Sequence, residues 1–143
     1  MAAKKDNPIP GFEKATKDFL DHPSQETYHW FINWFANAIN CKSEVYAIVV
    51  IEDLPDYQDP VMRLNRITVG DKTFFAFFTS EKFAQKSQWD ADIVKMSLDM
   101  VVELTLADES IAGLIVNPSD GKDASIPSNM IRECYEAVKN YKG

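Results

Sequence analysis

The sequence has few of the residues that build metal-binding or redox centres. Its 143 residues include two cysteines, Cys41 and Cys134, and two histidines, His22 and His29. Their spacing matches no metal-ligand or redox motif, so we expect no bound metal, no cofactor and no disulfide. Two unpaired thiols are best accommodated in a reducing compartment, and we therefore expect a cytoplasmic protein.

Positive charge is also scarce. The chain has 15 Lys and Arg residues against 22 Asp and Glu residues, which gives a formal net charge of -7. Proteins that bind nucleic acid or anionic lipid through phosphates need a basic surface, so we expect neither partner. The first residues lack the apolar segment of a signal peptide, and no apolar run approaches the roughly 20 residues that cross a membrane.

The commonest enzyme signatures are missing too. The sequence contains no Gly-rich phosphate-binding loop and no Gly-x-Ser-x-Gly nucleophile elbow. An acidic stretch holds Asp53, Asp56 and Asp59, but its spacing does not match a calcium-binding loop, which favours a solvated acidic face. We therefore predict no catalytic residue and keep a catalytic role only as an alternative.

What the chain does contain is enough apolar surface for a core. Hydrophobic residues make up 45% of the sequence and aromatic residues 12%, and a chain of this length fits one domain. Pro8, Pro10 and Gly11 disfavour regular structure at the N-terminus. We therefore expect a flexible lead-in over residues 1–11 and a single domain over residues 12–143.

Helical spacing predicts two helices before the first strand. The first covers Phe12–Leu20, and the second begins after Ser24 as N-cap and ends near Asn40. The second has an apolar stripe made of Tyr28, Phe31, Ile32, Phe35, Ala38 and Ile39. Trp30 and Trp34 lie beside this stripe, one helical turn apart. Because tryptophan is enriched at interfaces, they are candidate partner-binding residues, unless the first helix covers them.

The rest of the chain alternates between strands and helices. Five runs predict strands: Val45–Ile51, Arg66–Val69, Lys72–Phe78, Ile93–Met96 and Ile111–Val116. Further helices are predicted over Glu81–Gln88 and over Leu98–Thr105. A last helix is predicted with Pro127 in its first turn. Val45–Ile51 is apolar on both alternations, as in a strand buried on both faces. The expected fold is a mixed α/β (α+β) domain whose central mixed sheet of about five strands has helices on its faces.

Two predicted strand ends carry polar residues. Thr79 and Ser80 follow the aromatic strand, while Asn117 and Ser119 follow the aliphatic strand that ends at Val116. Ligand sites in α/β folds lie at such strand ends, and hydroxyls at a helix N-terminus can contact an anion. The same residue types also cap helices and form turns. We favour capping and turn roles, with a small-ligand site at these four residues as the alternative.

The order of these elements resembles the N-terminal domain of the SseB-like (enhanced serine sensitivity) proteins of bacteria. The resemblance covers residues 25–140 and rests on Phe78-Thr-Ser-Glu81, on Trp89 after the following helix, and on Gly113-Leu-Ile-Val-Asn-Pro118 before the last amphipathic helix. It implies the fold of that domain and a place among bacterial cytosolic proteins that are mostly uncharacterised.

These observations together predict a function class. The protein is expected to be a non-enzymatic protein-interaction or regulatory module of the bacterial cytoplasm, able to bind a protein partner or itself. The alternative is a small-ligand-binding or catalytic domain with its site near Thr79 and Asn117.

Overall fold

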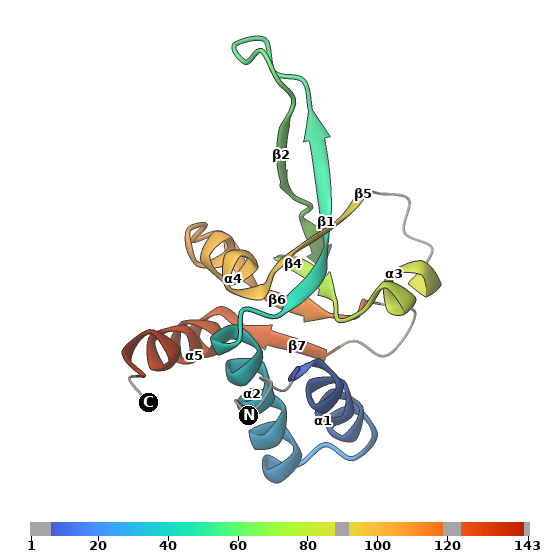
Figure 1. Cartoon of the computed structure of the whole chain (residues 1–143), viewed down its shortest axis with the longest axis vertical. Coiled ribbons are helices and arrows are strands. Elements are labelled where there is room, and N and C mark those ends of the chain that lie inside the picture. Colours follow the sequence, from blue (N-terminus) through green and yellow to red (C-terminus); the bar gives the residue numbers. More distant parts are fainter. Residues whose placement is uncertain (1–6, 88–91, 119–123, 142–143) are drawn as a thin grey trace, which may run out of the picture.

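Seven strands form one mixed sheet in the computed structural model, which describes residues 7–87, 92–118 and 124–141 (Figure 1). The strands are β1 (Glu44–Glu52), β2 (Val61–Leu64), β3 (Ile67–Val69), β4 (Lys72–Phe78), β5 (Asp92–Ser97), β6 (Ile111–Val116) and β7 (Ala124–Pro127). The mixed α+β class is confirmed, but the expected count of about five strands is wrong. β2 and β7 have four residues each, too few to show a clear alternation in the sequence.

β1 and β4 form the centre of the sheet. β4 pairs with β1 in antiparallel orientation and with β6 in parallel orientation, and β7 continues the sheet beyond β6. β5 lies along the other side of β1. The parallel pair brings the carboxyl ends of β4 and β6 to the same edge, where Thr79 and Asn117 follow.

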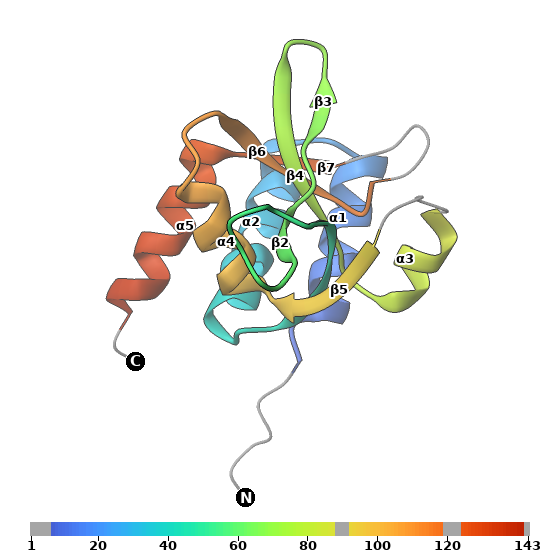
Figure 2. The ribbon, with the colours of Figure 1, turned by 90° about the horizontal axis from the view of Figure 1, so that it is seen from above.

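The chain between β1 and β4 doubles back twice as two hairpins. β1 runs on past β5 and pairs with β2 from Val49↔Leu64 to Glu52↔Val61. β3 then pairs with β4 across Gly70-Asp71, and the φ of +65° at Gly70 is a conformation that glycine adopts at little cost. This second hairpin confirms the turn predicted there. The two hairpins project from the body (Figures 1 and 2).

Five helices complete the described part of the chain. They are α1 (Ile9–Asp21), α2 (Gln25–Asn40), α3 (Glu81–Ser87), α4 (Leu98–Leu106) and α5 (Ser128–Asn140). α1, α2, α4 and α5 supply the main core together with one face of the sheet, which we call the helical face. Its centre is aromatic: the Phe12 ring stacks on Phe31 at 5.6 Å and on Phe77 at 6.4 Å between centroids. Ala84 of α3 packs on the opposite face, against Ile48 and Phe78 among others.

Of the predicted starts of α1, α2 and α5, one agrees with the structure and two differ. Ser24 caps α2 as predicted, because its hydroxyl accepts the backbone N–H of Thr27 at 3.1 Å. α1 begins at Ile9, so it includes part of the expected lead-in. Pro10 is tolerated because amides in the first helical turn have no intrahelical partner. Pro127 ends β7 and precedes α5, whose first residue is Ser128.

Candidate functional site

The structure brings Thr79 and Asn117 together at the ends of β4 and β6. The backbone N–H of Thr79 donates to Asn117 Oδ1 at 2.8 Å, and Asn117 Nδ2 donates to Thr79 Oγ1 at 3.1 Å. The backbone N–H of Asn117 donates to the carbonyl of Phe77 at 2.8 Å. Asn117 has a φ of +52°, a left-handed conformation that asparagine tolerates better than most residues. The amide side chain therefore ties the two strand ends together.

Glu13 of α1 completes this polar cluster. Thr79 Oγ1 donates to Glu13 Oε2 at 2.5 Å, and Thr79 is only 3% exposed. The single hydroxyl proton is thus directed at Glu13, while the oxygen accepts from Asn117. Glu13 lies 66 residues from Thr79, and no local pattern in the sequence links them. Both predicted site residues are already satisfied within the protein.

Ser80 lies beside this cluster and caps the N-terminus of α3. Its hydroxyl accepts the backbone N–H of Phe83 at 3.4 Å, as the capping interpretation requires. Ser119, the fourth residue of the predicted ligand site, lies outside the described residues. The described contacts therefore give Thr79, Ser80 and Asn117 structural roles, and their part in ligand binding stays a prediction.

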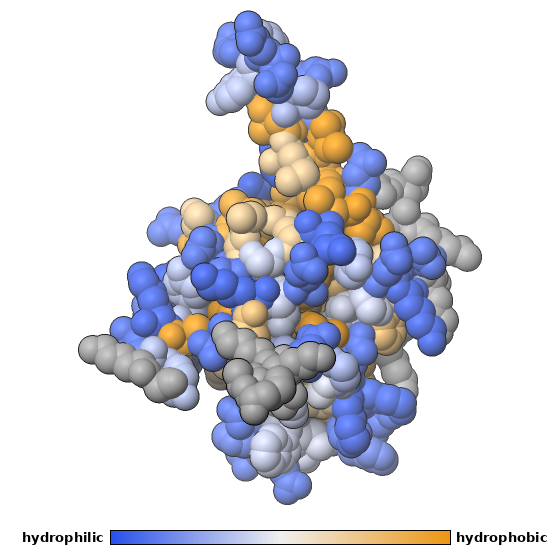
Figure 3. All heavy atoms as spheres, viewed as in Figure 1, coloured by the Kyte–Doolittle hydropathy of each residue, from blue (hydrophilic) through white to orange (hydrophobic). Residues whose placement is uncertain are grey.

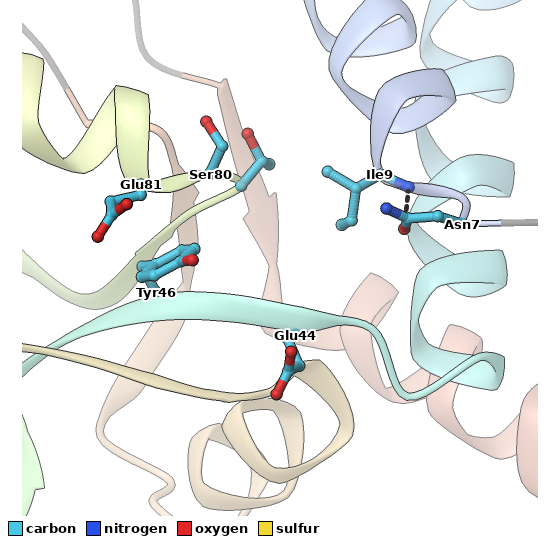
Figure 4. A pocket seen from close by; sticks show the side chains of 7 residues that line it. Asn7, Ile9, Glu44, Tyr46, Ser80 and Glu81 are labelled. Atoms are coloured by element: carbon cyan, nitrogen blue, oxygen red, sulfur yellow. Dashed lines mark hydrogen bonds between the residues drawn. The ribbon is translucent and has the colours of Figure 1, made fainter.

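A recess of about 370 Å³ opens next to Thr79 (Figure 4). Its lining consists of Asn7, Ile9, Glu44, Tyr46, Thr79, Ser80 and Glu81. In Figure 4, Tyr46 and Glu81 lie opposite Ile9 and Asn7, and Asn7 Oδ1 accepts the backbone N–H of Ile9 at 3.1 Å. The carboxylates of Glu44 and Glu81 oppose the binding of an anion in this recess. Within the described residues no three His, Cys, Asp or Glu side chains are grouped to hold a metal ion.

The two tryptophans of α2 differ in their surroundings. Trp34 is half-buried and lies against α1, where a Cβ at Gly11 would come within 2.5 Å of its ring. Trp30 is 55% exposed and borders a recess of about 280 Å³ between α1 and α2. The first helix therefore covers Trp34, as one of the two interpretations expected. Of the predicted partner-binding pair, Trp30 is the more accessible residue.

The sequence did not reveal one exposed apolar element, the hairpin formed by β1 and β2. We call residues 50–63 the arm, residues 53–60 its tip, and the rest its stem. Ile51 and Met62 pair directly across the stem and are 51% and 48% exposed. The prediction of a strand buried on both faces is therefore wrong at Ile51, because β1 continues beyond the helices that cover Val49.

Alternation along the strands determines which way this pair faces. Val49 and Leu64 are a cross-strand pair that is buried in the main core. Ile51 and Met62 are each two residues further along the arm, so they project from the same, helical face. The opposite face of the stem carries an ion pair between Glu52 and Arg63. Figure 3 shows apolar surface along the stem below a hydrophilic tip.

α4 adds a second exposed apolar pair on the same side of the sheet. Met100 and Leu104 are one helical turn apart and both are exposed, whereas Leu98, Val101 and Val102 are buried in the core. α4 lies beside β2 at the base of the arm in both ribbon views (Figures 1 and 2). The stem and α4, which meet at this corner of the molecule, thus both carry exposed apolar side chains.

No helix in the described ranges is both long and apolar enough to cross a membrane. Comparison of the chain with protein families, curated proteins and solved structures finds no significant match. The resemblance to the SseB-like family therefore stays a prediction, and the surfaces described above are the basis for assigning a function.

Proposed function

We propose that this protein is a non-enzymatic protein-interaction module of the bacterial cytoplasm, SseB-like in kind, and that the arm is its contact element. The observation that carries the proposal is the exposure of Ile51 and Met62 as a cross-strand pair outside the core. Large apolar patches that extend from the body of a protein usually mark interaction sites.

The stability of the fold does not explain why the arm is present. A two-stranded ribbon in water is marginally stable on its own, and unpaired strand edges invite unwanted pairing. The main core uses Val49 and Leu64 but no residue of the arm among its fully buried members. A partner that covers the stem would explain why the strands continue past this point.

The alternative of a small-ligand or catalytic site has weaker support. The Thr79 hydroxyl and the Asn117 amide are engaged with each other and with Glu13, so neither is free to meet a ligand without breaking those contacts. The adjoining recess offers two carboxylates and a tyrosine. The Ser80 hydroxyl that lines it accepts from the backbone N–H of Phe83, and no hydrogen bond among the described residues joins it to either carboxylate, as activation of a nucleophile would require.

Site-specific photocross-linking tests the proposal. A photoreactive phenylalanine analogue replaces Met62 in one variant and Ser125, which is exposed on the opposite face of the sheet, in the control. After irradiation in lysate of the source organism, we expect a discrete protein adduct from position 62 that is absent from position 125. Adding Ile51→Ser should abolish it. Identical products at both positions, or none at position 62, would contradict the proposal.

A further inference from the structure

We infer that the partner seats a basic amphipathic helix in the corner between the arm and α4. This inference rests on the proposed function and specifies the chemistry of the partner. Its apolar contacts are Ile51 and Met62 on the stem and Met100 and Leu104 on α4. Its charged contacts are the carboxylates of the tip.

The shape of the apolar surface favours a helix as the occupant. A helix presents apolar residues at i, i+3, i+4 and i+7, which suits a corner that offers two separate apolar pairs. Two of the four contact residues are methionines, whose flexible side chains adapt to an inserted helix. Strand addition is disfavoured, because β2 has four residues and offers few backbone hydrogen bonds to an added strand.

The charge of the tip determines the charge of the partner. Asp53, Asp56 and Asp59 are exposed, and no ion pair joins any of them to another described residue. Three unpaired carboxylates beside an apolar stem complement lysine or arginine on the partner. A second copy of this chain would bring a further net charge of -7 toward the same tip. Like charges at an interface are unfavourable, so a different, basic protein fits better.

A peptide binding experiment tests this inference. The probe is a fluorescent amphipathic peptide of about 18 residues, long enough to span a helical docking surface and made of leucine and lysine. One control peptide replaces each lysine with glutamate, and another scrambles the leucine and lysine order so that no apolar face forms. Fluorescence anisotropy at about 0.1 M salt, where the Debye length is about 10 Å, should show binding of the first peptide to the full-length protein and at least about tenfold weaker binding of both controls.

Protein variants assign the binding to the corner. Ile51→Ser with Met62→Ser, and Asp53→Asn with Asp56→Asn and Asp59→Asn, should each weaken binding about tenfold. A matched control removes three acids that are exposed on α2 and α5 by Glu26→Gln, Glu133→Gln and Glu136→Gln. It should change the dissociation constant by less than about twofold, because charges beyond a Debye length are screened. Unchanged denaturation midpoints verify that the variants are folded.

A methyl spectrum locates the peptide. With ¹³C-methyl methionine, the signals of Met62 and Met100 should shift on binding, while that of Met130 on α5 should not. Equal loss of binding in the α2/α5 control, shifts confined to Met130, or self-association that Met62→Ser abolishes would overturn the inference. If position 62 captures a partner in lysate but the basic peptide does not bind, the proposed function stands and this inference falls.

Discussion

The side chain of Asn117 makes the hydrogen bond to Thr79 that the backbone of a β6 residue would make in a longer strand. The last regular pair between the parallel strands is Phe77↔Val116. Beyond it, the Asn117 side chain accepts the backbone N–H of Thr79 at 2.8 Å, so the pairing extends by one more hydrogen bond. A side-chain amide can make this bond because the φ of +52° turns the backbone away from the strand direction.

Two substitutions at this position separate the hydrogen bond from the backbone conformation. Asn117→Gly keeps the left-handed φ accessible but removes the amide, and we expect the free energy of unfolding to fall by about 1–3 kcal/mol. Asn117→Ala removes the amide and adds roughly 1 kcal/mol of backbone strain. Urea denaturation of both variants measures the difference. An alanine variant as stable as the glycine variant would show that the conformation carries no strain.

Gly11 and Trp34 should be energetically coupled. A Cβ at Gly11 would come within 2.5 Å of the Trp34 ring, so Gly11→Ala should destabilise the protein by about 1 kcal/mol through overpacking. In a Trp34→Ala background the same change should become neutral or stabilising, because alanine favours the helix more than glycine does. A double-mutant cycle from denaturant melts measures the coupling. The same effect of Gly11→Ala in both backgrounds would refute the contact.

Val49 and Ile51 test the boundary between core and arm. Both lie on the helical face of β1, but Val49 is buried and Ile51 is about half exposed. Val49→Ala should lower the free energy of unfolding by about 2 kcal/mol, and Phe77→Ala in the core by about 3–5 kcal/mol. Ile51→Ala should cost less than about 1 kcal/mol, since surface changes have small effects. A large loss at Ile51 would assign it to the core and weaken its role in binding.

The two cysteines should differ in reactivity. Burial, with a smaller contribution from the Glu133 carboxylate, raises the pKa of the Cys134 thiol to about 11. Cys41 is only partly buried. At pH 8 we expect a thiol reagent to modify Cys41 well before Cys134, and both cysteines after unfolding. Mass spectrometry of the time course identifies the modified residue, and equal rates in the folded protein would contradict the burial of Cys134.

The raised pKa of Cys134 also sets a pH dependence. The folded protein holds this proton up to a higher pH than the unfolded chain, whose thiol titrates near the usual value of about 8.5. Stability from this group is therefore complete below that value and is lost as the pH rises toward 11. Cys134→Ala should flatten the decline in unfolding free energy over this range. An identical pH profile for wild type and variant would contradict the assignment.

Strong local patterns predicted most helices and strands but not which other elements pack against them. The Ser24 cap and the Gly70 turn were predictable because their hydrogen bonds and dihedral angles are local. The exposure of Ile51 was not predictable, since the pattern of apolar residues along the strand is the same whether or not helices cover it. Thr79 and Asn117 were grouped by the rule that α/β folds place ligand sites at strand ends, and the parallel pairing of β4 with β6 brings them together. Glu13 reaches them through the packing of α1, which no short pattern encodes.

The number of strands beside β1 changes at Val49. Up to that residue β1 pairs with β5 on one side and with β4 or β2 on the other, whereas its described pairs beyond it are with β2 alone. The arm can therefore open locally without unfolding the core, and its amides should exchange hydrogen sooner than those of β4. Binding at the stem would slow hydrogen exchange and proteolytic cleavage in the arm first. These two rates would therefore report a bound partner even when the free energy of global unfolding hardly changes.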